Sequence, residues 1–306
     1  MAVVGLGLMG GSLLRTLAEL PDRPALLGVD PDPVRGAQSL EGGFLDRYAP
    51  PGSALPYEAE LVVLACPLGA ATRFLREEGS SLPASTLVTD VVSLNAPILT
   101  GARSAGIVDR TVTAHPMCGS ERSGLPAQRA DLYRGERVWL SASSEATPAV
   151  RRRIEGFWRA VGSDPRWIDP EDHDRSMAWV SHLPQLVANA LAGALDAQGF
   201  QPADLGPGGR DMTRLARSSP VIWKELLEHS APVTGTGLTS ISRALNAVAD
   251  LLARRETDRI VEFMELTRRW AAGEATPGDG EAGNADEHDP EKGGRVPGLR
   301  DRSEER

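Results

Sequence analysis

The chain has 306 residues, a formal net charge of −9 and 41% apolar residues. This length suits one large or two medium domains, and the negative charge argues against nucleic acid or an anionic membrane as the main partner. Cys66 and Cys118 are too few for a disulfide framework, and no apolar run reaches the roughly 18 residues of a membrane span. We therefore expect a soluble cytoplasmic protein.

The first half of the chain alternates short apolar runs with helix-like segments. Most runs are bounded by Gly, Pro, Asp or Ser, which is typical of buried parallel strands with helices as crossovers. The predicted strands are Ala2–Val4, Ala25–Val29, Leu61–Cys66, Thr86–Val92, Ile107–Thr113 and Arg137–Ala142. We predict a Rossmann-type doubly wound α/β sheet over residues 1–146.

The pattern changes after residue 146. Ala149–Ala160 predicts one more helix and Arg166–Ile168 a last short strand. Beyond them only helical spacing of apolar residues remains, in His173–Gln198, Val221–Glu228, Leu238–Arg254 and Thr257–Trp270. We predict an all-α domain over residues 147–271. Residues 272–306 contain ten acidic and five basic residues and little that can be buried, which predicts a disordered acidic tail.

A glycine-rich turn follows the first predicted strand, in "AVVGLGLMGGSLL". Gly5, Gly7 and Gly10 fit the pattern G-x-G-x-x-G, which permits a tight turn, close approach of a pyrophosphate, and packing of helix on strand. The phosphates would then lie on free N–H groups where the next helix begins, around Leu8 and Met9. The turn predicts a dinucleotide site, although a purely structural glycine turn is the alternative.

The second predicted strand ends in Asp30, whose carboxylate can accept both ribose hydroxyls of NAD and would repel the 2′-phosphate of NADP. NAD is therefore the expected cofactor. Cys66 and Pro67, followed by Leu68 and Gly69, are expected at the neighbouring strand end beside the same crevice. Cys66 itself is more typical of a small core residue than of a nucleophile.

Two polar residues are expected at the carboxyl edge of this sheet, where ligands bind in open α/β folds. Ser93 follows the strand Thr86–Val92, and His115 follows Ile107–Thr113. Pro116 restricts His115 to extended geometry. For Ser93 the alternative is a helix N-cap.

Two further clusters lie in the helical half. His182, Gln185 and Asn189 form a polar stripe on a helix that Pro184 is expected to kink, and the alternative is a buried network. Arg210 and Arg214 can form a fork, meaning two neighbouring guanidinium groups that together bind a dicarboxylate. The alternative is a solvated basic face. No cysteine joins the histidines, so we predict no metal site.

Five stretches in this order resemble the prephenate/arogenate dehydrogenases of tyrosine biosynthesis. They are "VVGLGLMGGSLL", "DVVSLN", "HPMCGSERSG", "DHDRSMAWVSHLPQ" and "GGRDMTRLARSSPVIW". The resemblance runs from Val3 to about Trp270. It implies a Rossmann domain joined to a helical dimerisation domain, and NAD(P)-dependent oxidative decarboxylation of prephenate or arogenate by a homodimer.

The resemblance also implies roles for single residues. His115 corresponds to the histidine that takes the proton of the ring hydroxyl, and Ser93 to the serine that hydrogen-bonds that histidine and approaches the nicotinamide. His182 corresponds to a second active-site histidine, and Arg214 to the arginine that binds a substrate carboxylate. The remaining substrate-binding candidates are Arg210, Ser120, Glu121, Gly209, Asp211 and Trp223.

Two departures and several alternatives remain open. Gln185 stands where the family often has histidine, and Asn95 where lysine is common. The substrate could also be 4-amino-4-deoxyprephenate, because His115 can bond a hydroxyl or an amine. A β-hydroxyacid dehydrogenase needs a catalytic lysine in its helical domain, and this chain has only Lys224 and Lys292. A non-catalytic NAD-binding module is the remaining alternative.

Overall fold

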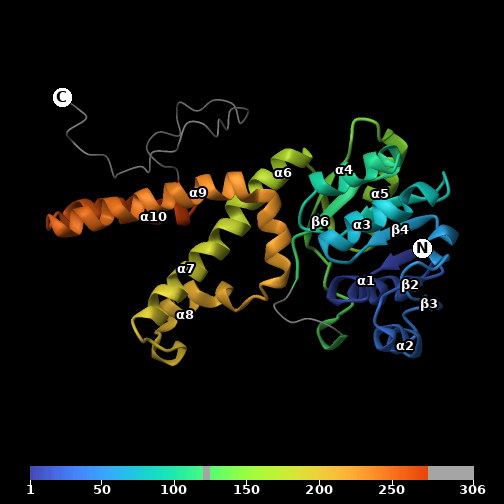
Figure 1. Ribbon diagram of the computed structural model, residues 1–306, viewed down its shortest axis with the longest axis horizontal. Helices are drawn as coiled ribbons and strands as arrows, with labels where there is room; N and C mark the ends of the chain where they lie inside the picture. Colours follow the sequence, from blue (N-terminus) through green and yellow to red (C-terminus); the bar gives the residue numbers. More distant parts are fainter. Residues whose placement is uncertain (120–124, 275–306) are drawn as a thin grey trace. The chain divides into compact units, whose positions relative to one another are not determined.

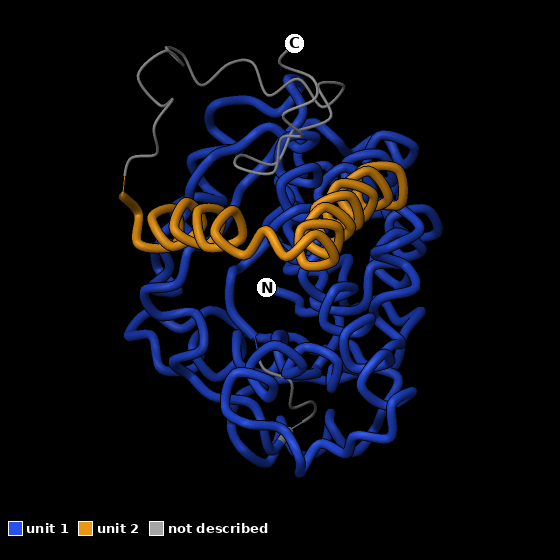
Figure 2. Tube along the Cα trace, turned by 90° about the vertical axis from the view of Figure 1, so that its left-hand side faces the viewer, with its two compact units in different colours: residues 1–230 blue, residues 231–306 orange. Residues whose placement is uncertain are grey.

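The computed structural model describes residues 1–119 and 125–274 (Figure 1). The chain forms two compact units, Met1–Ser230 and Ala231–Arg306 (Figure 2). All strands of the described residues belong to the first unit, and the described part of the second unit is helical. Within the described ranges no helix is long and apolar enough to cross a membrane.

Five parallel strands form the main sheet, in the order β3-β2-β1-β4-β5. This order reverses direction between β1 and β4, the point where ligands bind in doubly wound sheets. Four of these five strands lie within residue ranges that the sequence predicted as strands. The strand β3 was not predicted, because its three residues are exposed or half-buried and form no apolar run. The bounds are β1 Ala2–Val4, β2 Leu27–Val29, β3 Arg47–Ala49, β4 Leu61–Leu64 and β5 Leu87–Asp90.

A second sheet of three strands continues from the first. Its strands are β6 Thr113–Pro116, β7 Arg137–Ser141 and β8 Asp164–Trp167, with β6 antiparallel to β7 and β7 parallel to β8. A parallel bridge between Val88 and Thr111 joins it to β5. The predicted strand Ile107–Thr113 was misplaced, since Val108–Arg110 forms a 3-10 turn. Ile107 and Val108 explain the error, because both are apolar and buried and so resemble the start of a strand.

Helices cover both faces of the main sheet, which confirms the doubly wound fold. The core on one face contains residues of α3 and α4 together with Val62 and Leu64, whereas the core on the other face contains residues of α1 and α5 together with Val63. This alternation follows from the two-residue period of a strand. The helices are α1 Leu8–Ala18, α2 Pro33–Glu41, α3 Leu68–Glu78, α4 Ala96–Ser104 and α5 Pro148–Ala160.

The helices α6 Pro170–Met177 and α7 Leu183–Ala197 are joined by a π-helical turn, Ala178–His182. Pro184 lies in the first turn of α7, directly after the π turn. The irregularity expected around Pro184 therefore takes the form of a π turn. The described helices that follow are α8 Pro207–Thr213, α9 Val221–Ala253 and α10 Thr257–Ala271.

The predicted helices Val221–Glu228 and Leu238–Arg254 are one helix, α9. The residues between them include Pro232 and two glycines, which predict a break by intrinsic propensity. Ser230 and Thr234, which flank Pro232, are only 6% and 3% exposed. Packing around this stretch therefore outweighs the poor propensity.

The α/β part extends beyond its predicted end at residue 146. The strand β8 pairs with β7, and Ile154 and Trp158 of α5 are fully buried in the core shared with α1. The predicted boundary at 146/147 thus falls inside the α/β region. Of the predicted disordered tail, 272–306, only residues 272–274 lie within the described residues.

Candidate active site

The glycine-rich turn lies between β1 and α1, as predicted. Gly5 has a φ of 102°, and a Cβ at Gly5 or Gly10 would overlap a backbone carbonyl. By contrast, no atom lies within 4 Å of the position that a Cβ would take at Gly7. No side chain caps the helix that starts with Leu8 and Met9. The turn therefore presents the open surface of free N–H groups that a pyrophosphate requires.

Asp30 follows β2 beside this turn and is 2% exposed. Its Oδ2 accepts the N–H of Leu6 at 2.7 Å, and its Oδ1 accepts that of Asp32 at 2.8 Å. Arg35 of α2, which sequence analysis did not consider, lies 3.6 Å from Asp30 and 3.3 Å from Asp32. Two carboxylates and one guanidinium give the carboxyl end of β2 a net negative charge, which fits the hydroxyl groups of a ribose better than a phosphate.

The residues after β4 lie at the same edge. Pro67 is the N-cap of α3, and the N–H of Gly69 donates to Oε2 of Glu225 on α9 at 2.8 Å. A carboxylate of the helical region therefore reaches the carboxyl end of β4. Burial raises the pKa of Cys66 to about 12, so its thiol stays neutral and packs against the core.

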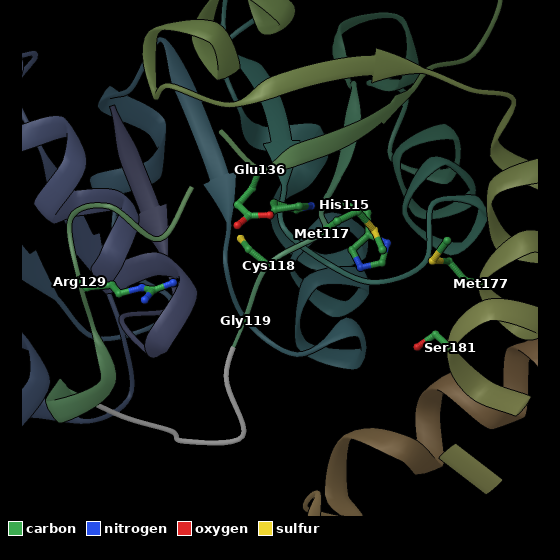
Figure 3. Close-up of a pocket in the computed structure, with 9 residues that line it drawn as sticks. His115, Met117, Cys118, Gly119, Arg129, Glu136, Met177 and Ser181 are labelled. Atoms are coloured by element: carbon green, nitrogen blue, oxygen red, sulfur yellow. The ribbon is translucent and has the colours of Figure 1, made fainter. Parts of the chain in front are cut away.

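A cavity of about 390 Å³ opens beside His115 (Figure 3). A parallel bridge joins Val88 of β5 to Thr111, two residues before β6, so His115 lies near the carboxyl edge of the sheet. The cavity is lined from β6, from the segment before β7, and from α6 with its π turn. The lining residues are His115, Pro116, Met117, Cys118, Gly119, Arg129, Glu136, Met177 and Ser181.

His115 is linked to two residues that sequence analysis left without a role. Its Nδ1 lies 3.0 Å from Nε2 of His173, and Nδ1 of His173 lies 2.7 Å from Oδ1 of Asp174. Burial, followed by the neighbouring imidazoles of His173 and His182, lowers the pKa of His115 to about 3. His115 is therefore a neutral imidazole at physiological pH, with one ring nitrogen unprotonated. In the sequence, the adjacent His173 and Asp174 were the signal that could have indicated this hydrogen-bonded pair.

The structure departs from the expectation for Ser93. Within the described residues Ser93 makes no hydrogen bond to His115, so the contact implied by the resemblance is not formed. The alternative role as N-cap is also wrong, because the N-cap of α4 is Asn95. Asn95 is fully buried and donates from Nδ2 to Oγ of Ser141 at 2.8 Å. A lysine at position 95 would have to bury its charge there.

The polar stripe on the π turn and α7 divides into two parts. His182 is 1% exposed, its Nδ1 lies 2.8 Å from Oγ of Ser230, and its ring packs edge-on against Trp223. Gln185 donates from Nε2 to Oδ1 of Asn189 at 2.7 Å and to the carbonyl of Leu215 at 2.9 Å. Gln185 is buried, whereas Asn189 is exposed, so only the inner half of this pair matches the buried network of the alternative interpretation. His182 does not line the cavity of His115.

The two arginines do not form a fork in the described structure. Arg210 of α8 donates from Nη1 to the carbonyl of Leu205 at 2.5 Å. Arg214 begins the next 3-10 turn and is exposed. Neither arginine lines the cavity, and neither do their neighbours Gly209 and Asp211.

The segment that follows β6 returns to the glycine-rich turn. Ser120 and Glu121 lie outside the described residues. Gln128 donates from Nε2 to the carbonyls of Leu6 and Gly7, each at 3.0 Å. These contacts link the chain after His115 to the dinucleotide turn, and no local pattern in the sequence indicated them.

Comparisons with known proteins match most of the chain to known sequence families. The sequence model of the family "Prephenate dehydrogenase, nucleotide-binding domain" matches residues 17–164, and that of "Prephenate dehydrogenase, dimerization domain" matches residues 169–266. The chain is 26% identical to a cyclohexadienyl dehydrogenase of Zymomonas mobilis, over 88% of this chain and 93% of that protein.

Two solved structures extend the comparison. Prephenate dehydrogenase from Aquifex aeolicus, in complex with hydroxyphenyl propionate and NAD⁺, is 25% identical with a TM-score of 0.80, covering 89% of this chain and 96% of that one. Synechocystis arogenate dehydrogenase is 22% identical with a TM-score of 0.76, covering 89% and 98%. The second likeness shows a shared fold.

Proposed function

The chain belongs to the prephenate dehydrogenase family and is a dinucleotide-dependent oxidoreductase; from this premise we propose that it is an NAD-dependent prephenate dehydrogenase. The reaction takes hydride from C4 of prephenate and releases the ring carboxylate as carbon dioxide, which yields 4-hydroxyphenylpyruvate for tyrosine biosynthesis. The observation that carries the proposal is His115, a neutral base that faces a cavity at the edge of the dinucleotide-binding sheet.

His115 accepts one proton in this reaction. As hydride leaves C4, that carbon becomes carbonyl-like, and the proton of its hydroxyl passes to the imidazole. The electrons of the broken carbon–carboxylate bond enter the ring, and aromatisation drives the step. Bound NAD supplies the hydride acceptor.

The residues of the turn fit NAD. The N–H groups beyond Gly7 would hold the pyrophosphate, and Asp30 the ribose hydroxyls. Ser93 and the residues Cys66 and Pro67 at the neighbouring strand end would approach the nicotinamide.

Both carboxylates of prephenate need cations, and we assign one of them to Arg214. Because Arg214 lies away from the cavity of its own chain, we propose that a second subunit completes the site with Arg214 of the partner subunit. A homodimer is supported by the match to a dimerisation domain and by apolar residues such as Val221 and Trp270, each 78% exposed. Around this site we place His182, Ser120, Glu121, Arg210, Gly209, Asp211 and Trp223.

Steady-state formation of NADH tests the proposal. The purified chain is assayed with prephenate, arogenate and 4-amino-4-deoxyprephenate, each with NAD and with NADP. We expect the highest kcat/KM with prephenate and NAD. A higher kcat/KM with arogenate or with the amino analogue would show that this compound is the substrate, and the chain would still act as a dehydrogenase of this family. If none of the three compounds is turned over, the proposed function is refuted.

A further inference from the structure

Three side chains form a series of hydrogen-bonded contacts that begins at the cavity: His115, His173 and Asp174. Nδ1 of His115 is 3.0 Å from Nε2 of His173, whose Nδ1 is 2.7 Å from Oδ1 of Asp174. The two imidazole rings stand nearly perpendicular, at 84°. His173 is fully buried, so no solvent competes for either of its ring nitrogens.

Asp174 determines which way these hydrogen bonds run. Its Oδ1 accepts the N–H of Asn95 at 2.7 Å, and its Oδ2 accepts that of Ala96 at 2.9 Å, so the carboxylate lies at the N-terminus of α4. An ionised carboxylate has no proton to donate. The proton between Asp174 and His173 therefore resides on Nδ1 of His173.

The direction of the second hydrogen bond follows from the first. A neutral His173 that carries its proton on Nδ1 has a lone pair on Nε2, and it must accept the Nδ1–H of His115. His115 then has its own lone pair on Nε2, the nitrogen that is left for the cavity. A doubly protonated His173 would instead force His115 Nδ1 to accept and make its Nε2 a donor, which cannot take a proton.

We propose that His173 and Asp174 are positioning residues that hold His115 in the tautomer whose Nε2 is basic. The proposal rests on the proposed function, in which His115 accepts the proton of the substrate. Once Nε2 is protonated, the imidazolium of His115 donates through Nδ1 to His173, and His173 donates to Asp174. The positive charge that develops during the reaction is thus stabilised by a carboxylate two hydrogen bonds away.

The tautomer can be measured on the unmodified protein without substrate. The chain has five histidines, so ¹⁵N-histidine labelling gives few signals, and the variant His115→Gln assigns the signals of His115. We expect ¹⁵N NMR at neutral pH to show a protonated Nδ1 and an unprotonated Nε2. A protonated Nε2 on neutral His115 would overturn the proposal. Because no substrate is involved, this result is independent of which compound the enzyme oxidises.

Variants of Asp174 test the effect on catalysis. An amide at this position can donate, so Asp174→Asn should allow the wrong tautomers and lower kcat by about 100-fold, within the range expected for general base catalysis. The KM values for substrate and NAD should change by less than about twofold. Asp174→Glu, which restores an acceptor, should recover part of kcat.

The matched control is Asp172→Asn. Asp172 is a carboxylate on the same helix, 55% exposed, and its side chain pairs with Arg175. Its kcat should equal that of the wild type. The proposal fails if the kcat of Asp174→Asn stays within about threefold of the wild-type value, even if the melting temperature of the variant is lower. In that case Asp174 only accepts the N–H groups at the start of α4.

Discussion

The dinucleotide turn and the cavity of His115 lie at the same sheet edge, but they are built differently. The turn is local: Gly5, Gly7 and Gly10 fall within six consecutive residues, and Asp30 follows on the next strand. The surroundings of His115 are assembled from β6, the segment before β7, α6 and its π turn. A local motif is recognisable in sequence, whereas an assembled site depends on packing between distant segments.

The largest expected effect concerns the assembled site. His115→Asn removes the proton acceptor and should lower kcat by about 10²–10⁴-fold, the usual contribution of a general base. The glycine-rich turn is untouched, so the Kd for NADH, measured by fluorescence titration, should not change. Near-normal turnover would remove His115 from the mechanism.

A second test asks whether Arg214 binds a carboxylate of the substrate. Arg214→Ala should raise the KM for prephenate by about 10–100-fold with little change in kcat, because a charge-assisted hydrogen bond contributes about 1.5–3 kcal/mol. Glu228, exposed and paired with Lys224, supplies a control in Glu228→Gln. An unchanged KM would refute the carboxylate role.

The local turn can be tested with two glycines. Gly10→Ala places a methyl group against the carbonyl of Gly5 and should lower the free energy of unfolding by about 1–3 kcal/mol. Gly7→Ala has open space around its new methyl group, so stability should be retained while the Kd for NAD rises. Equal melting temperatures for the two variants would contradict the different roles of these glycines.

A smaller effect is expected where the two regions meet. Gln128→Ala removes two hydrogen bonds to the carbonyls of Leu6 and Gly7, each with a net contribution of about 1 kcal/mol. We expect the KM for NAD to rise several-fold, measured at saturating prephenate. Gln198→Ala, at the end of α7, provides a comparison. No change in KM would mean that the two regions act independently.

The smallest expected effect is one of pH. Burial lowers the pKa of His115 to about 3, so its neutral form persists as the pH falls below the ordinary histidine value of 6.5. The kcat/KM for prephenate should therefore stay nearly constant between about pH 6.5 and 5.5, where an unperturbed histidine would lose most of its base form. A decline with a midpoint at 6.5 would show that His115 is hydrated when the substrate binds.

Sequence patterns predicted the doubly wound sheet, the helical second half and the position of His115 at the sheet edge. The predicted strand and helix bounds were wrong where the burial of residues or their intrinsic propensity did not match the element that the structure forms. The apolar residues Ile107 and Val108 are buried at a 3-10 turn and not in a strand, and the helix α9 continues through Pro232. The exposed or half-buried residues of β3 gave no apolar signal at all.

By itself, the sequence determined the dinucleotide turn, because the steric demands of Gly5 and Gly10 act within a few residues and leave a recognisable pattern. Only the tertiary structure decided the partners of His115. His173 lies 58 residues further along the chain, and a hydrogen bond over that separation depends on how α6 packs beside β6. The same reason explains Gln128, which reaches the glycine-rich turn across more than 120 residues. Such contacts have no local period or spacing, so folding alone brings them together.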